Sequence, residues 1–286
     1  MIIVIQCRDQ KGLVAAISGV LAADGLNIIS LREYVDQAEN RFFLRLELEE
    51  APDASILQAK LQMALPPDAI IAVNPMPGKK VVIMVSKEYH CLADILVRHY
   101  FKTLGAAVLC VIGNHGALQD ICNRFDIPFF LVAHETEPLR GTEPLQGTGL
   151  SAFESRILEI IREHGPDYII LAKFMRILSP AFVAGFPMRI INIHHSFLPA
   201  FAGARPYKQA FERGVKLIGA TAHFVTDELD EGPIIAQQII PVTHSLTVPD
   251  MVKAGKEIEV SVLAKALRLV FEDRVFVYRN KTVVFE

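Results

Sequence analysis

The fold is constrained most by a series of short, uninterrupted apolar stretches in the second part of the chain. They are KKVVIMVS, AAVLCVIGN, DYIILAKF and MRIINIHH, which begin at residues 79, 106, 167 and 188. The segments between them repeat apolar residues at helical spacing, as in SAFESRILEIIREHG from Ser151 onward. Strands without polar alternation are buried on both faces, and such strands alternating with helices predict a doubly wound, mostly parallel α/β sheet.

A different order of elements precedes this region. Residues 1 to 74 read as strand, helix, strand, strand, helix, strand, with a predicted hairpin around QAEN and a second helix that stops before Pro66. This is the ferredoxin-like βαββαβ order. The stretch NPMPGKK, with two prolines and a glycine, marks a domain boundary. We therefore expect an amino-terminal domain over 1–76 and a second domain over 79–286.

The composition argues against several classes of protein. With 286 residues, of which 51% are hydrophobic, the chain can bury sizeable cores. A net charge of -3 without a basic stripe argues against nucleic acid as a partner, and no apolar run approaches the ~20 residues of a membrane span. The four cysteines form no C-x-x-C pair, which favours a reducing compartment. We expect a cytoplasmic protein that binds neither nucleic acid nor membrane.

The stretch INIHHSFLPAF, Ile191 to Phe201, places polar side chains at the end of an apolar strand. Asn192 and His194 are two residues apart, so their side chains share a face of that strand. An amide donor beside an imidazole can polarise a carbonyl group, and the Gly-Pro turn of DELDEGP can present Asp230 as a base or orienting carboxylate. The three residues predict an acyl-transfer site, although the same spacing also fits an ordinary strand end and an ordinary turn.

Two other chemistries fit the same stretch poorly. A zinc site would need converging ligands, but His194 and His195 are adjacent in a strand and diverge, and no cysteine or histidine lies at ligand spacing. Ser196 lacks the G-x-S-x-G context of a nucleophile elbow. We therefore expect neither a metal nor a covalent nucleophile.

Three segments, INIHHSFLPAF, LAKFMRILSP and GATAHFVTDELDEGPIIAQ, resemble the formyltransferase fold family that uses 10-formyltetrahydrofolate. Over almost the whole chain the sequence resembles the formyltetrahydrofolate deformylases, which join an amino-terminal ACT domain to a formyltransferase-like hydrolase domain. The family's N-x-H motif and downstream aspartate fall on Asn192, His194 and Asp230. The resemblance implies attack of water on 10-formyltetrahydrofolate, giving formate and tetrahydrofolate for one-carbon and purine metabolism, with no metal and no cofactor.

Departures from the transferases of this fold indicate water as the acceptor. The strand at residue 79 runs into VSKEYHCLADIL, which has no glycine and so no glycine-rich phosphate loop. The transferases read H-P-S where this chain has His194, His195 and Ser196, and the second histidine matches the deformylase pattern. Two alternatives stay open, namely formyl transfer to a nucleotide or tRNA and a folate or amino-acid sensor without turnover.

The resemblance also implies the positions that bind the folate. They are Arg176, Ile177 and Leu178, together with His195, Thr226 and Leu229. Arg176 would hold the anionic glutamate tail, or it is an ordinary surface arginine. His195 would line the substrate site, or it is a loop side chain without a chemical role.

In the amino-terminal domain, DQKGLVAAISGVLAADGLNI resembles the ACT pattern, which implies an amino-acid effector site between paired domains. The matching positions are Gly12, Leu13, Asn27 and Ile28. A homo-oligomer follows from this interpretation. The alternative is a domain that only dimerises the protein.

Overall fold

The computed structural model describes residues 1–74, 77–133, 150–199 and 206–286. Residues 134–149, two residues of the linker NPMPGKK and the last two residues of INIHHSFLPAF lie outside the described residues. Within the described part of the chain, no helix is both long enough and apolar enough to cross a membrane.

The chain divides into two compact units. Unit 1 comprises Met1–Pro77, Glu272–Tyr278 and Val283–Glu286, and unit 2 comprises Gly78–Phe271 and Arg279–Thr282. The division expected from the sequence assigned all of 79–286 to the second domain, whereas the last fifteen or so residues are shared between the two units.

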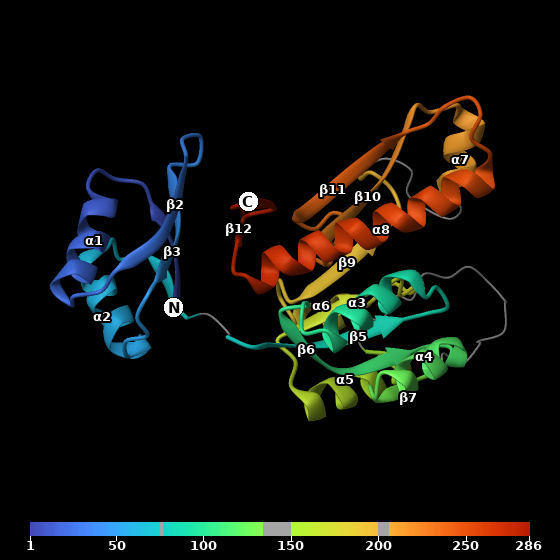
Figure 1. Cartoon of the computed structure of the whole chain (residues 1–286), viewed down its shortest axis with the longest axis horizontal. Helices are drawn as coiled ribbons and strands as arrows, with labels where there is room; N and C mark the ends of the chain where they lie inside the picture. The colour runs from blue at the N-terminus through green and yellow to red at the C-terminus, as the bar shows by residue number, and fades with distance from the viewer. Residues whose placement is uncertain (75–76, 134–149, 200–205) are drawn as a thin grey trace. The chain divides into compact units, whose positions relative to one another are not determined.

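Unit 1 contains a four-stranded antiparallel sheet in the order β2-β3-β1-β4 and two helices on one side of it (Figure 1). Its elements are β1 (Ile2–Arg8), α1 (Leu13–Ala23), β2 (Ile28–Asp36), β3 (Arg41–Leu48), α2 (Ala54–Ala64) and β4 (Ile70–Val73). Strand β1 alternates as a half-buried strand should, because Ile3, Ile5 and Cys7 are buried in a core that both helices share. The predicted ferredoxin-like order is confirmed.

The other face of this sheet is covered by the end of the chain. Strands β12 (Val275–Tyr278) and β13 (Lys281–Val284) pair in a hairpin. The Phe276 ring lies edge-on to Phe43 of β3, with centroids 5.7 Å apart, and it also contacts Phe285. This aromatic burial explains why these residues group with unit 1.

Unit 2 contains a seven-stranded sheet in the order β11-β10-β9-β8-β5-β6-β7. The strands from β9 to β7 in that order are parallel, and β10 and β11 join as antiparallel strands. Its strands are β5 (Lys79–Val85), β6 (Ala106–Gly113), β7 (Phe129–Leu131), β8 (Tyr168–Leu171), β9 (Ile190–His194), β10 (Leu217–Phe224) and β11 (Ile234–Pro241). The predicted doubly wound, mostly parallel sheet is confirmed.

Helices cover both faces of this sheet. Figure 1 shows α5 on one face, with α3 and α8 on the other. The helices are α3 (His90–Tyr100), the 3-10 turn η1 (Gly116–Leu118), α4 (Gln119–Arg124), α5 (Ala152–His164), α6 (Pro180–Ala184), α7 (Pro206–Arg213) and α8 (Val248–Phe271). Helix α8 begins after a capping interaction, in which the Asp250 carboxylate accepts from the Thr247 backbone N–H at 2.9 Å.

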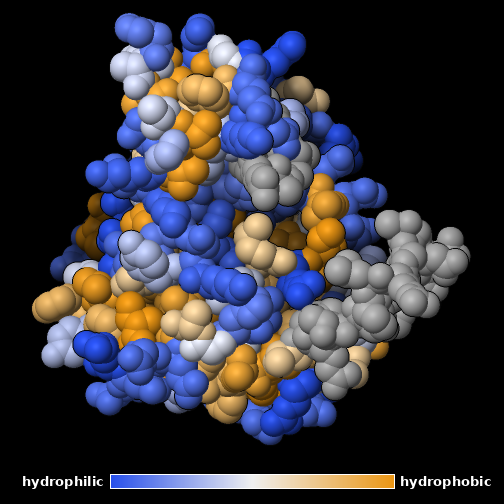
Figure 2. All heavy atoms as spheres, turned by 90° about the vertical axis from the view of Figure 1, so that its right-hand side faces the viewer, coloured by the Kyte–Doolittle hydropathy of each residue, from blue (hydrophilic) through white to orange (hydrophobic). Residues whose placement is uncertain are grey.

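The strand order locates the crevice of the sheet. From β5 the chain moves outward through β6 and β7, and from β8 it moves the opposite way through β9 to β11. Ligands of such sheets bind beyond the carboxyl ends of the strands, where the order reverses. The face at these carboxyl ends carries hydrophilic and hydrophobic side chains side by side (Figure 2).

Candidate active site

Strand β9 holds the first two predicted residues. Asn192 is half-buried and His194 is buried, and both lie in the central part of the sheet, between β8 and β10. Their register partners in β10 are His223 and Thr221, respectively. Residues two apart in a strand project from the same face, so the amide and the imidazole lie together, as expected from their spacing.

The loop between β10 and β11 brings the third predicted residue to them. Asp230 Oδ2 lies 3.2 Å from Nε2 of His194, although the two residues are 36 positions apart in the sequence. Asp230 has a φ of 58°, in the left-handed region that Asp and Asn tolerate better than most other side chains. Gly232 lets this loop close, because a Cβ there would collide with the carbonyl oxygen of Phe224. Asn192, His194 and Asp230 thus converge in the structure.

Both ring nitrogens of His194 form hydrogen bonds. With Nε2–H donating to Asp230, Nδ1 is left to accept from the hydroxyl of Ser196 at 3.0 Å. The hydrogen bond from His194 lowers the pKa of Asp230, against the effect of its partial burial. Asp230 is therefore ionised at neutral pH and can accept a proton.

His223 is a site residue that the sequence analysis missed. Its Nδ1 lies 2.9 Å from the carbonyl oxygen of Phe224, which assigns the proton to Nδ1 and leaves Nε2 to accept from Nδ2 of Asn192 at 3.2 Å. Burial lowers the pKa of His223, so this tautomer is neutral. An amide carries two N–H donors, so Asn192 keeps one for a substrate oxygen. The available signal was a histidine in the otherwise apolar strand GATAHF.

The side chains of His194 and His195 do not diverge as expected for neighbours in a strand, because β9 ends at His194. The two rings stack with centroids 5.0 Å apart and an interplanar angle of 28°, and the Tyr207 ring of α7 lies 6.4 Å from His195. Burial, reinforced by the charge of Lys173, lowers the pKa of His195 to about 4. The site therefore has a second imidazole that is neutral at physiological pH.

A buried ionic cluster, which the sequence analysis also missed, surrounds Glu259 of α8. Its carboxylate lies 2.7 Å from Nε2 of His90, 3.1 Å from Nζ of Lys173 and 2.9 Å from the hydroxyl of Tyr207. Burial would raise the pKa of Glu259, but the hydrogen bond from His90 and the charge of Lys173 outweigh it and lower that pKa to about 2. Burial and Glu259 together raise the pKa of Tyr207. We call these four residues the Glu259 cluster.

Two members of this cluster, together with the neighbouring Cys91, have the donor set of a metal site. Ligand atoms of His90, Cys91 and Glu259 all lie within 4.8 Å of one another, and all three residues are buried. The ammonium group of Lys173 already supplies a positive charge to the carboxylate, and burial raises the pKa of the Cys91 thiol, which keeps it protonated. We therefore assign an ion-pair cluster here and not a metal site.

The predicted folate-binding positions lie on two loops at the carboxyl edge of the sheet. Arg176 and Ile177 follow β8 and are exposed, and Leu178 is half-buried against the core of unit 2. Thr226 and Leu229 lie between β10 and β11, in the loop that also carries Asp230, and Leu229 is exposed. Contacts of these residues with a folate stay predictions.

The predicted effector positions lie at the start of α1 and of β2. Gly12 has a φ of 90° and precedes α1, and the side chain of Leu13 is buried in the core of unit 1. The amide of Asn27 donates to Glu49 at 2.9 Å, and Ile28 begins β2. None of these contacts tests effector binding.

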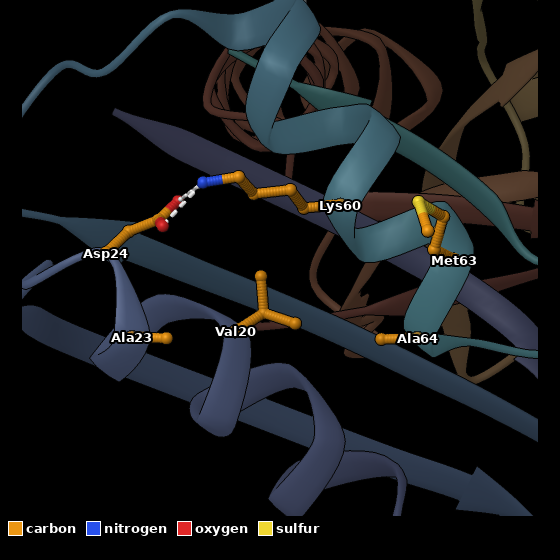
Figure 3. A pocket seen from close by; sticks show the side chains of 6 residues that line it. All are labelled: Val20, Ala23, Asp24, Lys60, Met63 and Ala64. Atoms are coloured by element: carbon orange, nitrogen blue, oxygen red, sulfur yellow. Dashed lines mark hydrogen bonds and ion pairs between the residues drawn. The ribbon is translucent and has the colours of Figure 1, made fainter.

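The hollow in Figure 3 lies elsewhere in unit 1, between α1 and α2. It has a volume of about 390 Å³ and is crossed by the ion pair of Lys60 and Asp24 at 2.6 Å. Its lining residues are Val20, Ala23, Asp24, Lys60, Met63 and Ala64. None of the predicted effector positions lines it.

Comparisons with known proteins divide the chain as the strand pattern does. The ACT domain family matches residues 1–62, and the formyl transferase family matches residues 79–267. The formyltetrahydrofolate deformylase of Escherichia coli strain K12 is 49% identical over 278 residues, which are 97% of this chain and 95% of the relative.

Solved structures give the same result. The crystal structure of a formyltetrahydrofolate deformylase from Pseudomonas syringae pv. tomato has a TM-score of 0.89 and 38% identity, and the match covers 100% of this chain and 94% of that one. A glycinamide ribonucleotide transformylase from Symbiobacterium toebii has a TM-score of 0.65 and 29% identity, and the match covers 73% of this chain and 95% of that one. The similarity to the transformylase thus leaves about a quarter of this chain unmatched, whereas the similarity to the deformylase extends over all of it.

Proposed function

This chain belongs to the formyltetrahydrofolate deformylase family, and we propose from this premise that it hydrolyses 10-formyltetrahydrofolate to formate and tetrahydrofolate by direct attack of water. The observation that carries the mechanism is the convergence of Asn192, His194 and Asp230, with Asp230 Oδ2 3.2 Å from the His194 ring. These groups supply a proton acceptor and hydrogen-bond donors, so no step calls for a metal ion or a cofactor.

In the first step, a water oxygen forms a bond to the formyl carbon. Asp230, ionised through its hydrogen bond with His194, accepts a proton from that water, alone or through His194. The carbonyl electrons move onto oxygen, where the free N–H of Asn192 stabilises the negative charge, and His194 joins it by sharing with that oxygen the Nε2–H that it donates to Asp230 in the resting site. The water is thereby split between the tetrahedral intermediate and the catalytic acid.

In the second step, the intermediate collapses. The bond between carbon and the folate nitrogen breaks, and the proton held at Asp230 and His194 goes to that nitrogen. Formic acid leaves and ionises to formate, and Asp230 regains its charge. The proton balance closes without a covalent acyl-enzyme, and the neutral His223 keeps Asn192 oriented throughout.

We place the folate between the two loops at the carboxyl edge of the sheet. Loop residues 176–178 follow β8, and the backbone N–H of Met175 donates to Ser86 Oγ at 3.0 Å, which ties this loop to the one after β5. Exposed apolar side chains such as Ile177 and Leu229 can cover the pterin, and Arg176 can pair with the glutamate tail.

Formyl transfer to a nucleotide or tRNA is the alternative within the same chemistry, and a sensor without turnover is the alternative outside it. A sensor has no need for an ionised aspartate, an oriented amide and an imidazole at one point. The test is to incubate the protein with 10-formyltetrahydrofolate in water alone and to follow both products. Formate release without an added acceptor supports hydrolysis, whereas turnover only with an amine acceptor would support transfer.

For unit 1 we propose an amino-acid effector at Gly12, Leu13, Asn27 and Ile28 and self-association of the chain through this ACT domain. A panel of free amino acids, followed by thermal shift and by the rate of formate release, tests the effector. Coupling of this kind is worth about 1–3 kcal/mol, which predicts a several-fold change in activity. If no amino acid changes either quantity, unit 1 serves assembly alone.

We also propose a cytoplasmic location. All four cysteines are free and buried, as in a protein of a reducing compartment. Fractionation of cells that express the protein tests this point.

A further inference from the structure

The Glu259 cluster has no part in the mechanism derived so far, and stability does not account for it. The side chain of Glu259 is 2% exposed and that of Lys173 is 8% exposed. A buried ion pair typically contributes little or nothing to stability compared with apolar side chains of the same volume, because both charges lose their water. Strongly perturbed ionisable groups next to a catalytic site are candidates for a role in the reaction.

The backbone is also adapted to hold the cluster. Lys173 has a φ of 62°, a left-handed conformation that costs free energy for a lysine and persists only where the surroundings impose it. Helix α8 approaches Tyr207 so closely that a Cβ on Gly255 would collide with the phenol ring. Both features place Lys173 and Tyr207 beside the imidazole of His195.

His195 differs from His194 in what it binds. Both ring nitrogens of His194 are occupied, by Ser196 and by Asp230. Among the residues that the structure describes, no side chain forms a hydrogen bond with the His195 ring. A neutral imidazole has one nitrogen that accepts a hydrogen bond, and an imidazolium has none.

We propose that a ring nitrogen of His195 accepts a hydrogen bond from the attacking water, and that Glu259 is the positioning residue for this contact. This inference rests on the proposed hydrolysis. Glu259 acts through Lys173 and Tyr207, which flank the imidazole. His195 orients the water while its proton goes to Asp230, so the proton balance of the reaction is unchanged. The stack on His194 brings the oriented water to the residues that complete the attack.

The pKa of His195 responds to titratable groups on four segments around it, namely Lys173 after β8, His194 in β9, Asp230 after β10 and Glu259 in α8. The phenol ring of Tyr207 in α7 lies 6.4 Å from the His195 ring. Burial is the largest cause of its low pKa, Lys173 and His194 act in the same direction, and Glu259 and Asp230 act in the opposite direction. Removing the cation of the cluster and removing its anion should therefore shift the pKa of His195 in opposite directions.

The first experiment isolates the ring nitrogen. His195→Phe keeps a flat ring for the stack but has no acceptor, and kcat for formate release should fall by about 10- to 100-fold with little change in KM. His195→Gln keeps an acceptor and should retain more activity than His195→Phe. The control is His244→Phe, because His244 is exposed, and this variant should match the wild type.

The second experiment measures the direction in which each charge shifts the pKa of His195. NMR titration of the His195 ring should give a higher pKa in Lys173→Met and a lower pKa in Glu259→Gln, and the acidic limb of kcat should move to higher pH in Lys173→Met. The controls are Lys253→Met and Glu257→Gln, which remove exposed charges from the same helix as Glu259 and should shift neither quantity.

A third variant covers the case in which a buried charge variant does not fold. Tyr207→Phe removes only the hydroxyl that donates to Glu259, and kcat should fall several-fold at constant KM.

A full rate in His195→Phe, or shifts of the same sign in Lys173→Met and Glu259→Gln, would overturn this inference and leave the proposed hydrolysis standing. Absence of formate from the wild-type protein would instead refute the proposed function, and with it the oriented water. The two failures are therefore distinguishable.

Discussion

The substitution Asp230→Asn removes one negative charge from the site and changes little else. Asparagine keeps an oxygen that accepts from Nε2–H of His194, now at 3.2 Å from the carboxylate. It also tolerates the φ of 58° that Asp230 adopts, since Asn and Asp are among the side chains most often found in that region. The rate of the variant therefore reports the charge and not a disturbed loop.

The geometry bounds the size of the effect. Two unit charges 3.2 Å apart interact by about 5 kcal/mol at an effective dielectric constant of about 20. This is an upper limit for the electrostatic stabilisation that Asp230 gives to a protonated His194, because the side chain of Asp230 is 22% exposed to solvent. Loss of a general base or its orienter lowers rates by about two to four powers of ten, which is about 3 to 5 kcal/mol. The two figures agree, so we expect kcat to fall by about 100- to 10,000-fold.

The assay is formate release from 10-formyltetrahydrofolate, together with the affinity for the folate. We expect binding to stay within a few-fold of the wild type, because the folate contacts proposed here lie on residues that the substitution leaves intact. Asp227→Asn is the matched control, since Asp227 is exposed in the same loop. If Asp230→Asn turned over within threefold of the wild type, the assignment of Asp230 as proton acceptor would be refuted.

Three further predictions follow from other contacts. His223→Leu should lower kcat by about tenfold or more without loss of folding, because Asn192 loses the acceptor that orients it, and a kinetic assay with circular dichroism checks this. Phe276→Ala should destabilise unit 1 by about 3 kcal/mol, because the ring is buried against Phe43, and chemical denaturation measures it. The pKa of Glu259 is depressed, so its stabilising effect is complete above the ordinary pKa of 4.5 and is lost as the pH falls toward about 2, a loss that acid unfolding of Glu259→Gln should not show.

The main sheet was predictable because its signal is local. An unbroken apolar run such as DYIILAKF records within eight residues that a strand is buried on both faces, and the run alone needs no knowledge of its neighbours. The position of the C-terminal hairpin on unit 1 was not predictable, since it depends on pairs such as Arg45 and Glu272, which are 227 residues apart.

The candidate site follows the same rule. Asn192 and His194 lie in one strand, so their spacing alone predicted a shared face, and the tight turn at Gly232 pointed to Asp230. The Glu259 cluster escaped because each member looks ordinary in its own segment. Glu259 reads as one more charged residue in a helix, and its bond to His90 spans 169 residues. Predicting such a cluster requires the packing of α3, α7 and α8 on the sheet.

The adjacent histidines His194 and His195 have different surroundings. His194 contacts a carboxylate directly, through the hydrogen bond with Asp230 that holds this acid in its ionised form. His195 lies near a cation, Lys173, whose carboxylate partner is Glu259, and burial together with the charge of Lys173 keeps the ring neutral down to a pH of about 4. Where the surroundings of two titratable groups drive their pKa values apart, the two groups take different catalytic roles. The proposed mechanism uses a charged group, Asp230, to accept the proton of water and an uncharged one, His195, to orient that water, and the unequal neighbours of His194 and His195 place the two groups side by side.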